Sequence, residues 1–178
     1  VKEGDIVVDI GASTGIFTHI ILPQKPKHVF CLEPSKTNCK KLTSKKIKNF
    51  QGTLEDFVAS DKFRKFDILT MMWTLCNTSN CYDILNQANE MCNKNGYIII
   101  AESSRILVPY KKPIQMYIRK GNPDIHSFHF SKNSLCNLLI ISKFKPVYIN
   151  RYIDSDWLVV VAKKTEKIHT SKIKLDKA

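Results

Sequence analysis

The sequence of 178 residues lacks any apolar run that approaches the length of a membrane span. Its six cysteines include no C-x-x-C pair, so metal ligation is not indicated. Several cysteines fall on apolar faces, which suits buried thiols in a reducing cytoplasm. No internal repeat or low-complexity segment interrupts the chain. Hydrophobic residues make up 43% and charged residues 25%, which predicts one soluble globular domain with a sizeable core.

Acidic residues are few compared with basic ones: 16 Asp and Glu against 28 Lys and Arg give a formal net charge of +12. Such a charge suggests an interaction with nucleic acid. The lysines gather mainly over 36–48 and 163–177, and neither cluster is interleaved with the aromatic residues that a base-stacking platform requires. Solvated basic faces are therefore favoured, with a polyanion-binding surface as the alternative.

The most informative stretch is 5–17, which reads DIVVDIGASTGIF. Its first part is apolar and β-branched except for Asp9, and this predicts a buried parallel strand. A tight turn and a helix follow, for which Ser13 is a good N-cap. Strand, turn and helix N-terminus should together present backbone N–H groups to a nucleotide-type ligand. Gly11 and Gly15 are expected to let that ligand approach the backbone, where a Cβ would collide.

A second apolar strand ends in an acid, Glu33. A carboxylate at this place could accept hydrogen bonds from both ribose hydroxyls of an adenosine. The fingerprint G-x-G-x-x-G of dinucleotide sites is absent, because its third position is Ser13 and its last is Phe17. The two strand ends together indicate an adenosine-containing ligand of another class.

Beyond Glu33, apolar segments and turn signals predict alternating strands and helices. Ser35 and Ser131 are good N-caps, and Gly96 is expected in the cap that ends a helix. The last two extended runs predict a closing antiparallel hairpin. The predicted strands are about 28–32, 47–51, 66–72, 97–102, 145–152 and 157–162, and the predicted helices about 36–44, 81–91 and 133–143.

The pattern D-x-G-x-S-x-G over Asp9–Gly15, followed by the strand-end acid Glu33, resembles motif I and the ribose-binding acid of the class I S-adenosylmethionine (SAM) dependent methyltransferases. The resemblance covers 5–164. It implies an α/β, Rossmann-like, doubly wound and mostly parallel seven-stranded sheet with an antiparallel C-terminal hairpin. It also implies S-adenosyl-L-methionine as the cofactor, bound by Asp9, Gly11, Ala12, Gly15, Glu33, Pro34, Thr53, Leu54, Met72 and Trp73.

Two positions depart from this family's pattern. Many members have an acid where Thr53 stands, so the adenine is expected to contact the Leu54 N–H, the Thr53 hydroxyl or Glu55. Many members that act on small molecules have His where Asn77 stands.

The resemblance also implies a domain plan. The methyltransferase domain should span 1–164, with 103–130 inserted on the substrate side and 165–178 as a basic polar tail. Members usually carry an N-terminal helical segment over the cofactor, so the chain is expected to be a fragment or a domain cut from a longer chain.

Two histidines, His126 and His129, lie in the sequence His-Ser-Phe-His-Phe-Ser before a predicted helix. Similar sequences occur in methyltransferases that act on sugars and other small metabolites, so either imidazole is a candidate general base. The alternative is that both merely cap or pack against the helix, and Glu102 is a further candidate base. Arg105, Tyr110, Tyr117 and Arg119 could form a rim for an anionic substrate or be surface residues.

Parts of the sequence are compatible with three other functions. The sequence Gly11–Gly15 also spells the G-x-S-x-G elbow of α/β-hydrolases, but few residues precede it and that fold has no role for Glu33. A DNA or RNA methyltransferase is the second. The loop 73–77 lacks the proline of amino-methylating enzymes, and Cys76 lacks the Pro-Cys pair of carbon-5 methylases, which favours a packed thiol. A non-catalytic SAM-binding domain is the third.

The sequence thus predicts a cytoplasmic SAM-dependent methyltransferase that acts on a small-molecule substrate. The favoured acceptor is an oxygen atom of a sugar or glycan precursor. Because the sulfonium is already activated, the protein mainly has to align the acceptor and, for a hydroxyl, remove its proton. No membrane partner is expected, nucleic acid is the disfavoured partner, and the oligomeric state is not indicated.

Overall fold

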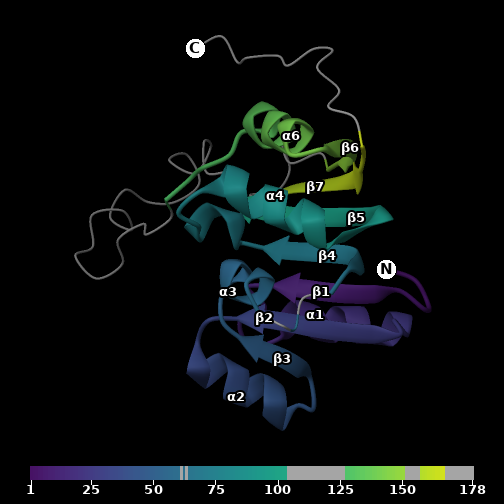
Figure 1. The fold of residues 1–178 in the computed structure, drawn as a ribbon, viewed down its shortest axis with the longest axis vertical. Coiled ribbons are helices and arrows are strands. Elements are labelled where there is room, and N and C mark those ends of the chain that lie inside the picture. The colour runs from purple at the N-terminus through teal and green to yellow at the C-terminus, as the bar shows by residue number, and fades with distance from the viewer. Residues whose placement is uncertain (61, 63, 104–126, 151–156, 167–178) are drawn as a thin grey trace.

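The computed structural model describes residues 1–60, 62, 64–103, 127–150 and 157–166. They form one mixed sheet with helices on both faces (Figure 1). The strands are β1 Ile6–Ile10, β2 His28–Glu33, β3 Lys48–Gln51, β4 Phe66–Met72, β5 Cys92–Ser103, β6 Phe144–Ile149 and β7 Trp157–Lys164. The helices are α1 Ile16–Ile21, α2 Lys36–Ser44, α3 Leu54–Val58, α4 Cys81–Met91 and α6 Lys132–Ile141, with 3₁₀ turns η1 at Leu22–Gln24 and η2 at Leu75–Asn77.

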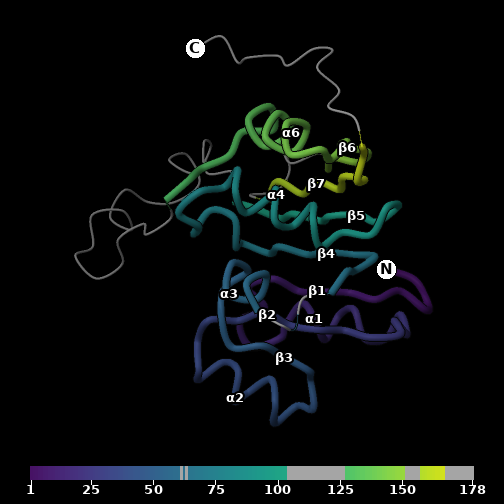
Figure 2. Tube along the Cα trace, viewed as in Figure 1, coloured from purple at the N-terminus to yellow at the C-terminus, as the bar shows by residue number. Residues whose placement is uncertain are grey.

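The strand order is β3-β2-β1-β4-β5-β7-β6. Strands β1 to β5 pair in parallel, whereas β7 pairs antiparallel with both β5 and β6. The trace in Figure 2 shows the consequence: the early purple and blue strands lie in one half of the sheet, and the green and yellow segments lie in the other. The chain reverses direction across the sheet between β1 and β4, and ligands bind at such a point in doubly wound sheets. This topology confirms the predicted fold class.

The central strand β1 is apolar because both of its faces are covered. Val8 and Ile10 pack into the large core under α3, α4 and α6, while Val7 packs with Ile21 of α1 on the opposite face. A parallel strand buried on both faces is expected to be a continuous apolar run. The one polar residue of this strand, Asp9, is 1% exposed and therefore needs partners inside the protein.

The structure corrects the predicted start of α1. Ser13 is not its N-cap: the N-cap is Gly15, with φ of 79° and no side-chain cap. The turn passes through the left-handed region at both Ser13 (φ 51°) and Gly15, so the helix begins two residues later than predicted. The Ser13 N–H instead donates to Glu33 at 2.8 Å.

Gly96 is not a helix cap either. Helix α4 ends at Met91, its C-cap Cys92 is extended, and β5 begins at Cys92, five residues earlier than predicted. A Cβ on Gly96 would lie 2.7 Å from the Asp67 carbonyl oxygen, so glycine is required by the close approach of β4 and β5. The N-caps Ser35 and Ser131 and the predicted helices 36–44 and 81–91 are confirmed.

The hairpin of β6 and β7 is confirmed, with the Asn150 N–H donating to the Val159 oxygen at its closed end. Its loop, 151–156, lies outside the described residues, as do most of the predicted insertion and tail. Among the helices that the structure describes, none has the length and apolarity needed to cross a lipid bilayer.

Candidate cofactor site and methyltransferase family

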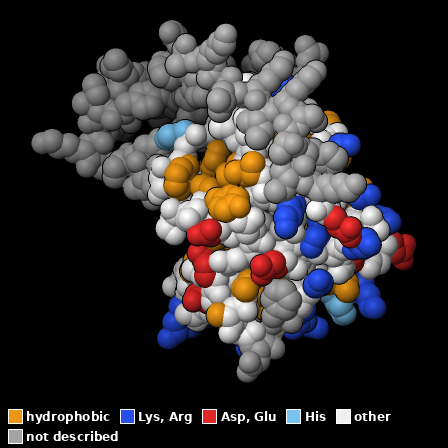
Figure 3. All heavy atoms as spheres, turned by 45° about the horizontal axis from the view of Figure 1, so that its top comes forward, with side chains coloured by type: hydrophobic (Ala, Val, Ile, Leu, Met, Phe, Trp, Pro, Cys, Tyr) orange, Lys and Arg blue, Asp and Glu red, His pale blue; other side chains and the backbone are white. Residues whose placement is uncertain are grey.

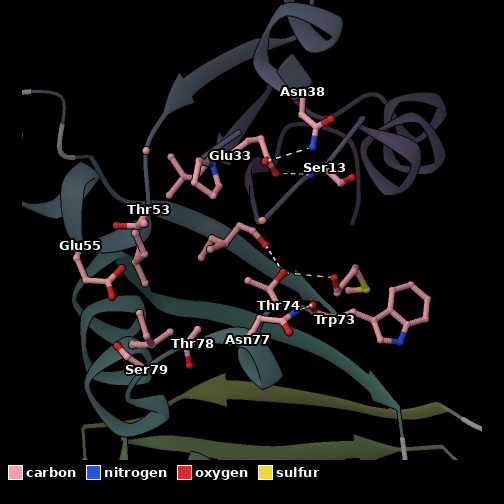
Figure 4. Close-up of a pocket in the computed structure, with 18 residues that line it drawn as sticks. Ser13, Glu33, Asn38, Thr53, Glu55, Trp73, Thr74, Asn77, Thr78 and Ser79 are labelled. Carbon is pink, nitrogen blue, oxygen red and sulfur yellow. Dashed lines mark hydrogen bonds between the residues drawn. The ribbon is translucent and has the colours of Figure 1, made fainter. Parts of the chain in front are cut away.

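A cleft of about 640 Å³ opens at the carboxyl ends of β1, β2 and β4. Its position is the one expected for a ligand of a doubly wound sheet, and its volume suits a nucleoside-sized molecule. Four stretches of the chain contribute to it, 10–13, 32–38, 52–55 and 72–84, so residues far apart in the sequence meet there (Figure 4). The lining consists of Ile10, Gly11, Ser13, Leu32, Glu33, Pro34, Asn38, Gly52, Thr53, Leu54, Glu55, Met72, Trp73, Thr74, Asn77, Thr78, Ser79 and Ile84.

Glu33 is the acid held most firmly in this cleft. Its Oε2 accepts a hydrogen bond from the Ser13 N–H at 2.8 Å. Its Oε1 accepts one from the Ser35 N–H at 2.9 Å and a longer one from the Asn38 side-chain amide at 3.3 Å. Figure 4 shows Ser13 and Asn38 converging on this carboxylate. A carboxylate has about four acceptor positions, so room is left on Oε2 for a ligand hydroxyl, and Asn38 can yield its place on Oε1.

The glycine turn is built for the protein's own packing. A Cβ on Gly11 (φ 73°) would lie 2.3 Å from Oγ1 of Thr74, and one on Gly15 would lie 2.7 Å from Cδ2 of Leu42. Thr74 in turn donates to the Ile10 oxygen at 2.9 Å. The positions that a Cβ would take at Gly11 and Gly15 are therefore filled by side chains of the chain itself.

The backbone N–H groups of the turn, which were predicted to face a ligand, are bonded within the protein. The N–H groups of Gly11 and Ala12 donate to the Leu32 oxygen at 2.8 and 3.1 Å, and that of Gly15 donates to the Ala12 oxygen at 2.9 Å. With the Ser13 N–H on Glu33, four donors of the turn are satisfied internally. A site of this kind does not offer the anion cradle that a pyrophosphate requires.

Asp9 is directed away from the cleft described above. Its carboxylate accepts hydrogen bonds from Oγ1 of Thr18 at 2.7 Å and from Oγ1 of Thr70 at 2.8 Å. Burial raises the pKa of this carboxyl above its ordinary value of 3.8, the two hydroxyls oppose that rise, and the charge of Glu33 adds to it. Asp9 thus ties α1 to β1 and β4 beneath the turn.

This raised pKa gives a pH-dependent expectation for Asp9→Asn. In the wild type, the folded state binds the Asp9 proton more tightly than the unfolded state does. This proton therefore stabilises the folded state fully below pH 3.8, and the stabilisation is lost as the pH rises through the pKa of the folded state. The Asn side chain has no such loss. Urea unfolding between about pH 4 and about pH 7 should show the variant gaining stability relative to the wild type. Parallel stability curves would contradict the assignment.

Trp73 separates the cleft from a second cavity. The residue has φ of 53°, uncommon for an aromatic side chain, and is held by hydrogen bonds from its N–H to the Ala101 oxygen (2.8 Å) and from the Asn77 amide to its own oxygen (2.9 Å). In Figure 4 its ring points away from Glu33. The ring packs edge-on against Trp157, with centroids 4.2 Å apart.

The second cavity, of about 510 Å³, lies on the α1 face and is almost entirely apolar. It shares Gly11, Ser13, Met72 and Trp73 with the cleft, so the two spaces adjoin at the end of β4. Its lining consists of Asp9, Gly11, Ala12, Ser13, Ile16, Phe17, Ile20, Met72, Trp73, Ile99, Ala101, Trp157 and Val159.

The wall opposite the glycine turn is the N-terminus of α3. Thr53 forms a capping box with Asp56: its hydroxyl accepts from the Asp56 N–H at 3.2 Å, and its own N–H donates to Oδ2 of Asp56 at 2.8 Å. The hydroxyl is thus already used by the helix. Glu55 is exposed and lines the cleft on this side, facing Ser79 across it (Figure 4).

The predicted cofactor residues divide into three groups. Asp9 and Ala12 line only the second cavity, and Gly15 lines neither space. The others border the cleft: Gly11, Glu33, Pro34, Thr53, Leu54, Met72 and Trp73. Sequence reasoning missed Asn38 and Ser79. Only Asn38 carried a usable signal, because it lies in the first turn of the helix that follows Glu33.

Of the two histidines predicted as bases, the structure describes only His129. His129 is exposed on the segment before α6 and is not part of the cleft lining, and His126 lies outside the described residues together with Arg105, Tyr110, Tyr117 and Arg119. Glu102 is 1% exposed, so it is not available as a base open to substrate.

Cys76 is buried, and desolvation raises the pKa of its thiol, which makes it a poor nucleophile. In the described part of the chain no group of three His, Cys, Asp or Glu residues is placed to hold a metal ion.

Comparison with known proteins identifies the family. The family model described as "Methyltransferase domain" matches residues 2–145. No curated protein matches the sequence. Among solved structures, a chain of the complex between the Haloferax volcanii Trm112 methyltransferase activator and a methyltransferase is similar, with a TM-score of 0.76 and 14% identity over 93% of this chain and 84% of that one.

Two further solved structures share the fold. The SAM-dependent methyltransferase TM1293 of Thermotoga maritima, described as a possible histamine N-methyltransferase, has a TM-score of 0.70 and 19% identity over 93% of this chain and 84% of that one. The 1,6-didemethyltoxoflavin-N1-methyltransferase of Burkholderia thailandensis has a TM-score of 0.69 and 16% identity over 92% of this chain and 72% of that one. With the family match over most of its length, the chain belongs to the methyltransferase domain family, the class I SAM-dependent methyltransferases.

Proposed function

We propose that the chain transfers a methyl group from SAM to a small metabolite, and that an oxygen atom of a sugar or glycan precursor is the first acceptor to test. The observation that carries the proposal is the Glu33 carboxylate, fixed by three donors at the tip of β2 inside a nucleoside-sized cleft. Such a carboxylate is preorganised to bind the two ribose hydroxyls of an adenosine. The internal use of the turn's N–H groups supports a ligand without phosphate.

The cleft around Glu33 and the apolar cavity that adjoins it suggest how the cofactor would be held. The adenine would lie toward Thr53 and Leu54, and the methionine end toward the glycine turn and Trp73. When bound, SAM supplies a methyl group already activated by its sulfonium. The apolar cavity on the far side of Trp73 adjoins the cleft at Met72, and it offers space for an acceptor next to that end.

The chain's own part in the reaction is to align the acceptor and handle its proton. The acceptor oxygen forms a bond to the methyl carbon, the carbon–sulfur bond breaks, and its electron pair stays on sulfur. A hydroxyl acceptor also loses a proton, and His129 or His126 is the proposed base because either imidazole can accept a proton near neutral pH. The location proposed for this reaction is the cytoplasm, in keeping with six free cysteines.

A nucleic-acid methyltransferase is the second candidate, since the net charge is +12. Figure 3 shows Lys and Arg side chains lying among Asp and Glu side chains on the face in view. The described lining of the cleft contains Glu33 and Glu55 but no Lys or Arg. Both observations favour a small acceptor over a polyanion.

Transfer of a tritium-labelled methyl group from SAM tests the proposal. We expect labelling of one or more members of a panel of sugars, nucleotide sugars and phenols, and no labelling of RNA or DNA. Affinity for RNA and DNA is measured in parallel across a salt series. Methylation of nucleic acid, with binding that weakens steeply as salt increases, would overturn the small-acceptor proposal. SAM binding without labelling of any acceptor would instead favour a non-catalytic domain.

A further inference from the structure

Glu102 is a buried acid that the reaction proposed above does not use. It lies near the carboxyl end of β5, next to β4 in the sheet, and is 1% exposed. Its Oε1 accepts a hydrogen bond from the Cys76 N–H at 3.3 Å. Its Oε2 is buried and has no hydrogen-bond partner among the described residues. A buried carboxyl with an unpaired oxygen destabilises a fold, so its presence calls for a role beyond packing.

The Cys76 peptide group that Glu102 binds is held from both sides. Its N–H donates to Glu102, and its carbonyl oxygen accepts the Phe128 N–H at 3.1 Å. Three segments distant in sequence, around 76, 102 and 128, therefore meet at one residue.

The segments that meet at Cys76 connect the cleft with one of the proposed bases. On the cofactor side, Cys76 lies in η2, between Thr74 and Asn77, which line the cleft. The Asn77 amide donates to the oxygen of Trp73, so the position of η2 also sets that of the Trp73 loop. On the other side, Phe128 precedes His129 directly and α6 by a few residues.

We propose that Glu102 is a positioning residue: by fixing the Cys76 peptide, it holds the cofactor-binding loop 73–77 and the segment 127–130 in one arrangement. Both roles rest on the proposed function: the one on the cofactor side on the placement of SAM in the cleft, and the one on the acceptor side on His129 as the base. A side chain shorter by one methylene or lacking the carboxyl cannot reach the Cys76 N–H, and both segments then lose their common anchor.

The test compares Glu102→Ala and Glu102→Gln in the full chain. Two properties are measured: the Kd for S-adenosylhomocysteine by calorimetry, and amide hydrogen exchange of peptides that cover 73–77 and 127–130. For Glu102→Ala we expect a Kd raised about fivefold and faster exchange in both peptides. Glu102→Gln keeps an acceptor oxygen for the Cys76 N–H and should restore both properties.

Cys92→Ala is the matched control. Cys92 is fully buried on the same strand, but at its opposite end, paired with Phe66 at the start of β4. It should lower the melting temperature without changing either property. Equal changes in this control, or unchanged exchange at 127–130 in Glu102→Ala, would overturn the proposal. If Glu102→Ala does not fold, Glu102→Asp replaces it with the same expected exchange pattern.

The two readouts need no acceptor. A failure to find methyl transfer would therefore reject the proposed function while leaving the inference on Glu102 intact. An unchanged Kd and unchanged exchange in Glu102→Ala would reject the inference on Glu102 while leaving the proposed function intact.

Discussion

Glu33→Ala should weaken SAM binding about tenfold or more, the cost of losing charge-assisted hydrogen bonds to the ribose. The wild-type carboxylate is only 6% exposed and is already oriented by the Ser13 and Ser35 N–H groups. A ligand therefore gains its bonds without ordering the side chain, and the full cost appears when the side chain is removed.

Intrinsic fluorescence offers a direct measurement of this effect. The chain has two tryptophans, Trp73 and Trp157, and their rings are in contact beside the cleft. A change of emission on adding SAM therefore reports on the site, and calorimetry supplies an independent Kd. An unchanged Kd for Glu33→Ala in both measurements would reject the ribose role.

Three further variants act as controls for Glu33→Ala. Glu33→Gln keeps an acceptor for the Ser13 and Ser35 N–H groups but loses the charge, so its Kd should lie between those of wild type and Glu33→Ala. Asn38→Ala removes the longest of the three bonds to Glu33 and is expected to change the Kd by about threefold at most. Glu55→Ala removes an exposed acid from the opposite wall and shows whether loss of charge alone weakens binding.

Gly11→Ala should destabilise the fold by roughly 2–5 kcal/mol, because two costs add. An L-residue at φ 73° costs about 1–2 kcal/mol, and a Cβ placed 2.3 Å from Oγ1 of Thr74 forces the turn or β4 to move, at about 1–3 kcal/mol. Both effects act where β1 meets the loop after β4. Urea unfolding followed by circular dichroism gives the free energy of unfolding.

Gly4→Ala separates the two costs. Gly4 has φ of 88°, but nothing lies within 4 Å of the position that its Cβ would take. This variant should lose only the backbone term of about 1–2 kcal/mol. A double-mutant cycle of Gly11→Ala with Thr74→Ala should then recover part of the clash, since Thr74→Ala removes the two nearest atoms. Equal losses for the Gly4 and Gly11 variants would show that Thr74 does not confine the turn.

Much of the fold was predictable because its signals are local. The apolar run of β1, the acid at the end of β2 and the serine caps of α2 and α6 depend on neighbours within a few residues. The N-cap of α1 was not predictable in this way. Ser13 has a side chain suited to an N-cap, but its N–H donates a hydrogen bond to Glu33, which lies at the end of β2.

The candidate site divides in the same manner. Glu33 was predicted from its strand-end position and lines the cleft, whereas Asp9, predicted from the resemblance to motif I, is turned toward Thr18 and Thr70. Thr70 is 61 residues away from Asp9 in the sequence, and its strand becomes a neighbour only through the order of the sheet. No spacing rule within one segment contains that information.

By itself the sequence determined the type of fold and the position of Glu33 at the end of β2, since hydrophobic periodicity and turn chemistry act over short distances along the chain. Tertiary structure alone decided what each polar group of the site is bonded to. The Thr74 hydroxyl beneath Gly11 comes from the loop after β4, and the Glu102 carboxyl beneath Cys76 comes from β5; strand pairing brings both into place. Buried donors and acceptors must find partners, and the strand order decides which partners lie within reach.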